Sequence, residues 1–101
     1  MSKLYFIENG RCKCKDGSST SGVGDSGAVH VSQGLYSSKE AFAITYDDGD
    51  VKITVGNSTS DVRHGLSNEK ITQTQFNDNG IIVTSEKGNR YFSHSGGGKR
   101  L

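Results

Sequence analysis

The sequence predicts an all-β fold, a small single-domain antiparallel barrel or sandwich that is built from hairpins and has about eight short strands. Of the 101 residues, 13 are Val or Ile and seven are Thr, against four Leu and three Ala, and β-branched side chains favour strands. Turn signals divide the chain at Asn9-Gly10, Asp48-Gly49, Asn79-Gly80 and Lys87-Gly88. Short strands joined by such turns indicate an antiparallel meander.

The first hairpin is expected to turn at Asn9-Gly10, a dipeptide that suits a two-residue connection. Such a turn pairs Ile7 with Cys12 and Tyr5 with Cys14. Paired residues of an antiparallel ladder lie on the same face, so these four side chains are expected to pack together.

Two segments and the C-terminal tail look too polar or too glycine-rich to form strands. Residues 16–27 hold four Gly, four Ser and one apolar side chain, so we expect a flexible loop there, and a flexible tail at residues 95–101. Residues 57–68 are expected to be irregular. A strand is expected at residues 28–32, and the helix capping-box pattern at residues 37–40 predicts at most one helical turn.

The longest hairpin predicted lies between residues 40 and 56. If its turn consists of Asp48 and Gly49, six apolar side chains fall in cross-strand pairs on one face. These pairs are Tyr46 with Val51, Ile44 with Ile53, and Phe42 with Val55.

A three-strand meander is expected at residues 71–76, 81–85 and 89–94. On the same two-residue-turn assumption, one face of this meander carries Phe76, Ile81, Val83 and Phe92, with Arg90 and His94 at its edge.

Charge and hydropathy exclude several classes of protein. Lys and Arg total 12 against 11 Asp and Glu, so no overall field attracts nucleic acid or an anionic membrane. The longest apolar run, residues 81–83, is too short for a membrane span or a signal peptide. Two cysteines one residue apart are no disulfide framework, so we expect reduced thiols and a cytoplasmic protein without membrane partners.

Cysteine and histidine offer the one combination with metal-ligand chemistry, namely Cys12, Cys14, His30 and His94, with His64 as a further imidazole. The spacing is unlike that of structural zinc sites, and free cysteine is often buried as a small apolar residue. We therefore expect no metal and no cofactor, and keep this ligand set as an alternative.

The start of the chain is similar to PAAR-like spike-tip proteins of contractile secretion systems, on the residues Gly10, Cys12, Cys14, Gly17, Val29, Val31 and Tyr36. The resemblance covers about a quarter of the chain and implies a β-rich tip with metal ligands. The prolines and later cysteines of that family are absent here. A metal-dependent tip module is accordingly the second alternative function.

The tetrapeptide at residues 24–27, Gly-Asp-Ser-Gly, resembles the nucleophile loop of chymotrypsin-like serine proteases. In that family the catalytic His and Asp precede the Ser, whereas all three histidines here follow Ser26. We therefore expect no catalytic centre and no enzymatic activity.

Basic and aromatic side chains are expected together on the first hairpin, where Phe6, Arg11, Lys13 and Lys15 fall on the face away from Tyr5. The sequence thus predicts a non-enzymatic interaction or assembly module of phage or secretion-apparatus type, which binds another protein or a second copy of itself. The first alternative is a small nucleic-acid-binding β-barrel, in which charge and base stacking hold a single strand.

Overall fold

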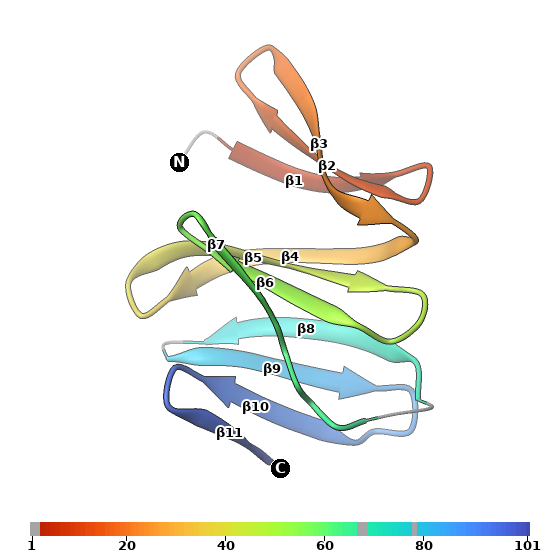
Figure 1. Ribbon diagram of the computed structural model, residues 1–101, viewed down its shortest axis with the longest axis vertical. Coiled ribbons are helices and arrows are strands. Elements are labelled where there is room, and N and C mark those ends of the chain that lie inside the picture. Colours follow the sequence, from red (N-terminus) through yellow and green to blue (C-terminus); the bar gives the residue numbers. More distant parts are fainter. Residues whose placement is uncertain (1–2, 67–68, 78) are drawn as a thin grey trace.

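The computed structural model describes residues 3–66, 69–77 and 79–101. It confirms the all-β class: every regular element in the described chain is a strand, and all pairings are antiparallel. The described residues form eleven strands, more than the eight expected, in three open sheets that follow one another along the longest axis (Figure 1). They form no closed barrel, and no helix among them could cross a membrane.

Sheet A is the N-terminal sheet, and its first hairpin has the predicted register, with Tyr5 opposite Cys14 and Ile7 opposite Cys12. The turn residues Asn9 and Gly10 have φ of 54° and 74°, as the two-residue turn requires. The segment expected to be a flexible loop, residues 16–27, instead contains the third strand of this sheet, which pairs with the second strand. In order, sheet A consists of β1 (Lys3–Glu8), β2 (Arg11–Asp16) and β3 (Ser19–Ser26).

Sheet B is the middle sheet and contains the most buried strand, β5, whose last six residues are all buried. The first strand of this sheet is longer than the 28–32 expected. The capping-box segment forms a turn in which Ser37 and Ser38 have φ of 50° and 68°, so it contains no helical turn. Sheet B consists of β4 (Ala28–Tyr36), β5 (Lys39–Tyr46), β6 (Val51–Val55) and β7 (Ser58–Asp61).

The register predicted for the β5–β6 hairpin is wrong by one residue. Ala43, not Ile44, lies opposite Ile53. The loop has three residues, 47–49: Gly49 has a φ of 93°, and its N–H donates to the carbonyl of Tyr46 at 3.0 Å. A loop whose third residue is a left-handed glycine is a common three-residue hairpin. The apolar residues Phe42, Ile44 and Tyr46 therefore face away from Val51, Ile53 and Val55.

Sheet C is C-terminal, and its β9–β10 hairpin departs from the prediction for the same reason. The N–H of Gly88 donates to the carbonyl of Ser85 at 3.0 Å, which makes a three-residue loop of residues 86–88. Tyr91, not Phe92, therefore lies opposite Val83 on the inner face. Sheet C consists of β8 (Ile71–Asn77), β9 (Gly80–Ser85), β10 (Arg90–His94) and β11 (Gly97–Arg100), the last within the tail expected to be flexible.

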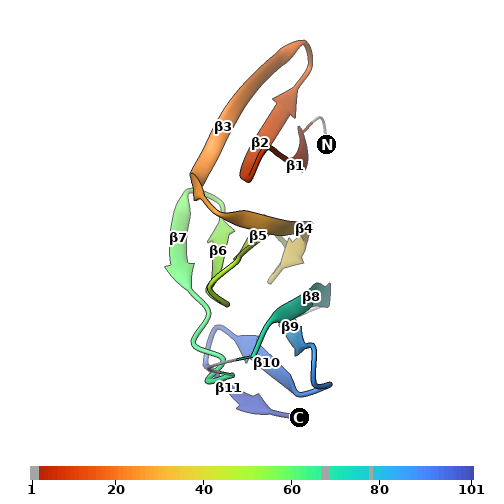
Figure 2. The ribbon, with the colours of Figure 1, turned by 90° about the vertical axis from the view of Figure 1, so that its right-hand side faces the viewer.

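Sheet B is the middle of three layers, and β5 contributes to the core on both of its faces (Figure 2). Towards sheet A, Phe42 stacks on Tyr5 with ring centroids 4.0 Å apart. The buried A–B core consists of Cys12, Ala28, Phe42, Ile44 and Tyr46. The buried B–C core consists of Ala43, Val51, Ile53, Val62, Leu66, Ile71, Ile81 and Val83.

Of the segment at residues 57–68, expected to be irregular, residues 57–66 contain β7 and then a stretch that leaves sheet B, residues 62–66; residues 67–68 lie outside the described residues. Val62 and Leu66 in this stretch are buried in the B–C core. His64 fixes its path: Nδ1 accepts from the N–H of Leu66 at 3.0 Å, and Nε2 lies 2.9 Å from the carbonyl oxygen of Gly49. Backbone and histidine contacts thus hold residues 62–66, none of which belongs to a strand.

Candidate functional site

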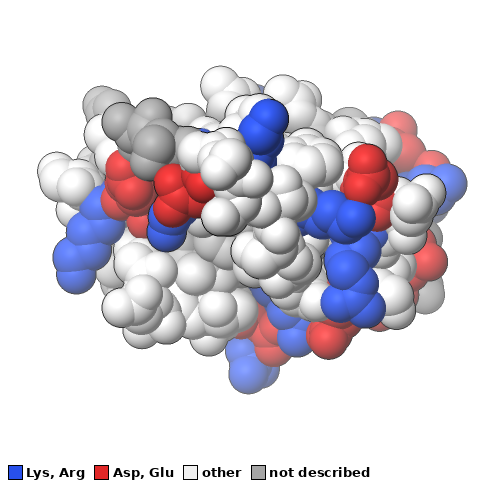
Figure 3. All heavy atoms as spheres, turned by 90° about the horizontal axis from the view of Figure 1, so that it is seen from above, with Lys and Arg blue, Asp and Glu red and all other residues white. Residues whose placement is uncertain are grey.

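The outer face of sheet A is the surface that points away from sheet B. The ladder brings together there all four residues predicted as a binding surface, since Phe6 pairs with Lys13, and Arg11 and Lys15 occupy the same face. Figure 3 looks down on this end of the molecule and shows basic side chains around an uncharged centre, with acidic side chains among them. The two-residue turn at Asn9-Gly10 sets this arrangement.

Two of the three cations on the outer face are held in place. Nζ of Lys13 lies 2.7 Å from Oε1 of Glu8, and a guanidinium N–H of Arg11 donates to the carbonyl of Gly24 at 3.0 Å. The Arg11 chain also passes over Gly22, where a Cβ would lie 3.5 Å from its Cδ. The side chain of Arg11 therefore lies along β3. Lys15, near the end of β2, is exposed.

Leu4 is a member of this surface that the sequence analysis missed. It pairs with Lys15 on the outer face and is 57% exposed, while its neighbour on that face, Phe6, is half-buried. The alternation of β1 could have shown this, because Leu4 and Phe6 are two residues apart. The outer face therefore combines two apolar side chains with the three cations.

The inner face of sheet A carries the two cysteines, which are both free thiols. Cys12 is fully buried with Tyr5 and Ile7 beside it, as the predicted register requires. Burial, with a smaller contribution from Cys14, raises the pKa of Cys12 to about 11. Burial and the neighbouring Cys14 also raise the pKa of Tyr5 to about 12. At neutral pH Cys12 is therefore a protonated thiol inside the A–B core.

The histidines of the alternative metal set do not gather around these cysteines. His30 is exposed on β4, and His94 lies on β10 in sheet C, next to the ring of Phe92 at 5.4 Å. Sheet B separates β10 from β2 (Figure 1). Within residues 3–66, 69–77 and 79–101, no three His, Cys, Asp or Glu side chains are grouped as metal ligands.

Alkaline pH is expected to destabilise the fold through Cys12 and Tyr5. Both groups have a higher pKa in the folded than in the unfolded state, so the folded chain holds its protons longer. Stability is therefore expected to fall as pH rises from about 9 towards 12, over the range between the unfolded and folded pKa values. Urea unfolding at several pH values measures this slope. The slope should be shallower in Cys12→Ala than in the parent, because that variant removes one of the two groups whose pKa is raised. Equal slopes for Cys12→Ala and the parent would contradict the assignment.

The protease-like tetrapeptide forms the end of β3 and the turn into β4. The N–H of Asp25 donates to the hydroxyl of Tyr46 at 3.2 Å, and the carbonyl of Gly24 accepts from Arg11. A Cβ at Gly24 would meet the Tyr46 hydroxyl at 2.6 Å, so this glycine allows β3 to approach β5 closely. Gly24 and Asp25 thus bring the end of β3 against Tyr46 of sheet B.

Comparison with known proteins gives no relative. No family model, no curated protein and no solved structure matches the chain. Function is therefore inferred from the outer face of sheet A described above.

Proposed function

We propose that the protein is a non-enzymatic module that binds another protein through the outer face of sheet A. The observation that supports this most is the exposed Leu4 beside Phe6 on a sheet face that no described layer covers. A sheet face with apolar side chains at its centre and cations around them fits a protein surface with an apolar patch and acidic neighbours. With its thiols reduced, such a module would act in the cytoplasm.

The charges of this face favour protein over nucleic acid as the partner. Lys13 already pairs with Glu8, and Arg11 is hydrogen-bonded to the backbone of β3. A nucleic-acid groove needs several cations that remain available to phosphates. Two apolar side chains with partly neutralised cations are better suited to a protein surface.

Removing the apolar and cationic side chains of the outer face is expected to weaken the complex without unfolding the domain. In Leu4→Ala/Lys15→Ala the affinity for a protein captured from the source cells should fall at least about tenfold. The matched control is Ile82→Ala/Lys99→Ala on the outer face of sheet C, which should bind as the parent does. Circular dichroism checks that both variants are folded.

Assays with the purified parent and the outer-face variant distinguish a protein partner from a nucleic-acid partner. Equal capture by the outer-face variant and the parent would contradict the proposal. Binding to a single-stranded oligonucleotide that falls steeply with salt, about one power of salt concentration per phosphate contacted, would replace it with the nucleic-acid alternative.

A further inference from the structure

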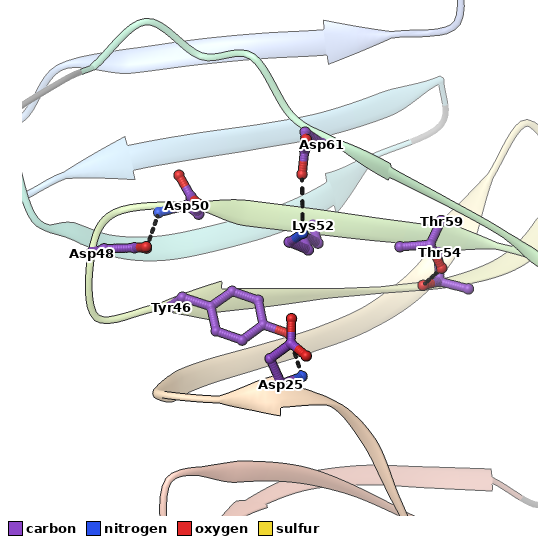
Figure 4. Close-up of polar contacts among 8 residues, drawn as sticks. All are labelled: Asp25, Tyr46, Asp48, Asp50, Lys52, Thr54, Thr59 and Asp61. Carbon is purple, nitrogen blue, oxygen red and sulfur yellow. Dashed lines mark hydrogen bonds and ion pairs between the residues drawn. The ribbon is translucent and has the colours of Figure 1, made fainter.

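One side of sheet B is not covered by sheet A. On the face that carries Ile44 and Phe42, the neighbouring strands β6 and β7 present polar side chains to solvent, because cross-strand partners share a face. Lys52 lies 3.5 Å from Asp61, and the hydroxyls of Thr54 and Thr59 are 2.8 Å apart (Figure 4). Lys52 and Thr54 are partly exposed and Thr59 and Asp61 are exposed, so no other described strand covers this part of the face.

A groove of about 210 Å³ lies at this place, between the end of β3 and strands β6 and β7. Its floor is apolar, formed by Phe42, Ile44 and Tyr46, while Asp25 and Lys52 carry charge at its rim. Pockets for drug-sized ligands usually measure about 300–1,000 Å³. The groove is smaller than that and has room for one or two side chains.

The strand that borders the groove has a free edge. Among the described strands, β3 pairs with β2 alone. Its first five residues are Ser19, Thr20, Ser21, Gly22 and Val23, with none of the Lys, Pro or inward-pointing charges that commonly guard edges. Beyond them the edge is occupied, because the N–H of Asp25 already donates to Tyr46. The open edge therefore ends at Val23, beside the groove.

We propose that an extended peptide segment of a partner protein adds to sheet A as a fourth strand by pairing with β3. Strand addition supplies backbone hydrogen bonds, and pockets under alternate side chains supply selectivity. The end of the peptide next to Val23 places one aliphatic side chain in the groove. This edge is a second binding surface, separate from the outer face of sheet A.

The charges at the groove favour a basic peptide. Asp25 is exposed at the rim, and Asp61 lies on the neighbouring strand with 60% of its side chain accessible. Among the described residues that line the groove, the one cation is Lys52, which already pairs with Asp61. A Lys or Arg side chain of the peptide, on the same face as the aliphatic one, meets Asp25.

A symmetrical synthetic peptide tests the proposal in either strand direction. The probe is acetyl-Lys-Thr-Val-Thr-Val-Thr-Lys-amide, which puts lysine and valine on one face. In an NMR titration of the full chain, backbone amide shifts are expected at residues 19–23 and around the groove. Two further peptides carry N-methyl groups, one on its valines and the other on its threonines. Alternate N–H groups of a strand point to opposite sides, so only one of the two sets can donate to β3. One methylated peptide should therefore lose binding and the other should keep it.

A pair of charge variants tests the groove. Asp25→Asn keeps the backbone bond to Tyr46 and should weaken binding of the lysine peptide at least about threefold. Glu86→Gln removes the same charge from sheet C and should leave binding unchanged. The proposal is overturned by no shift at about 2 mM peptide, by equal binding of both methylated peptides, or by shifts at Leu4 and Phe6 in place of β3. Shifts at Leu4 and Phe6 alone would still support the outer face of sheet A as a binding surface. The strand-addition proposal and the outer-face proposal can therefore fail independently.

Discussion

Replacing Phe42 with alanine is expected to lower the free energy of unfolding by about 3–5 kcal/mol, the usual cost of truncating a buried phenylalanine. Its side chain is 8% exposed and stacks on Tyr5 across the A–B interface. The variant should therefore loosen sheet A from sheet B. Urea unfolding measures the total loss, and hydrogen exchange should show amides of β1 and β2 losing protection before those of β9.

The matched control for Phe42 is Phe92→Ala, which truncates the same residue type on the outer face of sheet C. Phe92 is only half-buried, so its loss should cost clearly less. A loss below about 1 kcal/mol for Phe42→Ala, or equal losses for the two variants, would contradict the position of Phe42 in the A–B core.

Replacing Ile81 with alanine is expected to cost about 2–5 kcal/mol, because a fully buried isoleucine leaves a cavity in a packed core. Ile81 is 0% exposed and belongs to the B–C core with Ala43 and Val83. Here hydrogen exchange should show sheet C losing protection first. Denaturant unfolding gives the magnitude.

The next residue along β9 supplies the control. Ile82 points to the outer face of sheet C, opposite Phe92, and is partly exposed. Ile82→Ala should therefore cost less than Ile81→Ala although the substitution is chemically identical. A larger loss for Ile82 would mean that the inner and outer faces of sheet C are exchanged.

Turn chemistry explains which hairpin registers could be predicted. Asn9-Gly10 supports left-handed φ at both positions, and the register of the first hairpin was predicted correctly. At Gly49 and Gly88, the glycine is the third residue of a longer loop, so a two-residue turn was the wrong assumption. The sequence of β5 could not reveal the wrong register, because apolar residues lie on both faces of this strand and fit either register.

Strands β3 and β11 could not be predicted, because their sequences contain almost no apolar side chains. Backbone pairing holds β3 to β2, and Val23 is its one contribution to the A–B core. In β11 one glycine has a steric role: a Cβ at Gly98 would overlap the hydroxyl of Tyr91. The glycine content of this segment predicts a flexible tail, but in the structure Gly98 allows β11 to lie close to the ring of Tyr91.

The candidate surfaces were predictable to different degrees. Phe6, Arg11, Lys13 and Lys15 were placed together correctly, since their positions follow from one turn and strand alternation. The groove beside β3 had no signal in the sequence. It arises where a three-stranded sheet meets a four-stranded one, and neither the strand β3 nor the stacking was foreseen.

Strand β5 belongs to two cores at once, with sheet A on one face and sheet C on the other. Nuclear Overhauser contacts from its adjacent residues Phe42 and Ala43 report on the two faces separately. The structure predicts contacts between the Phe42 and Tyr5 rings, and between the Ala43 methyl group and the cluster around Ile81 and Val83. Contacts that place Phe42 against Val55 on a single apolar face would contradict it.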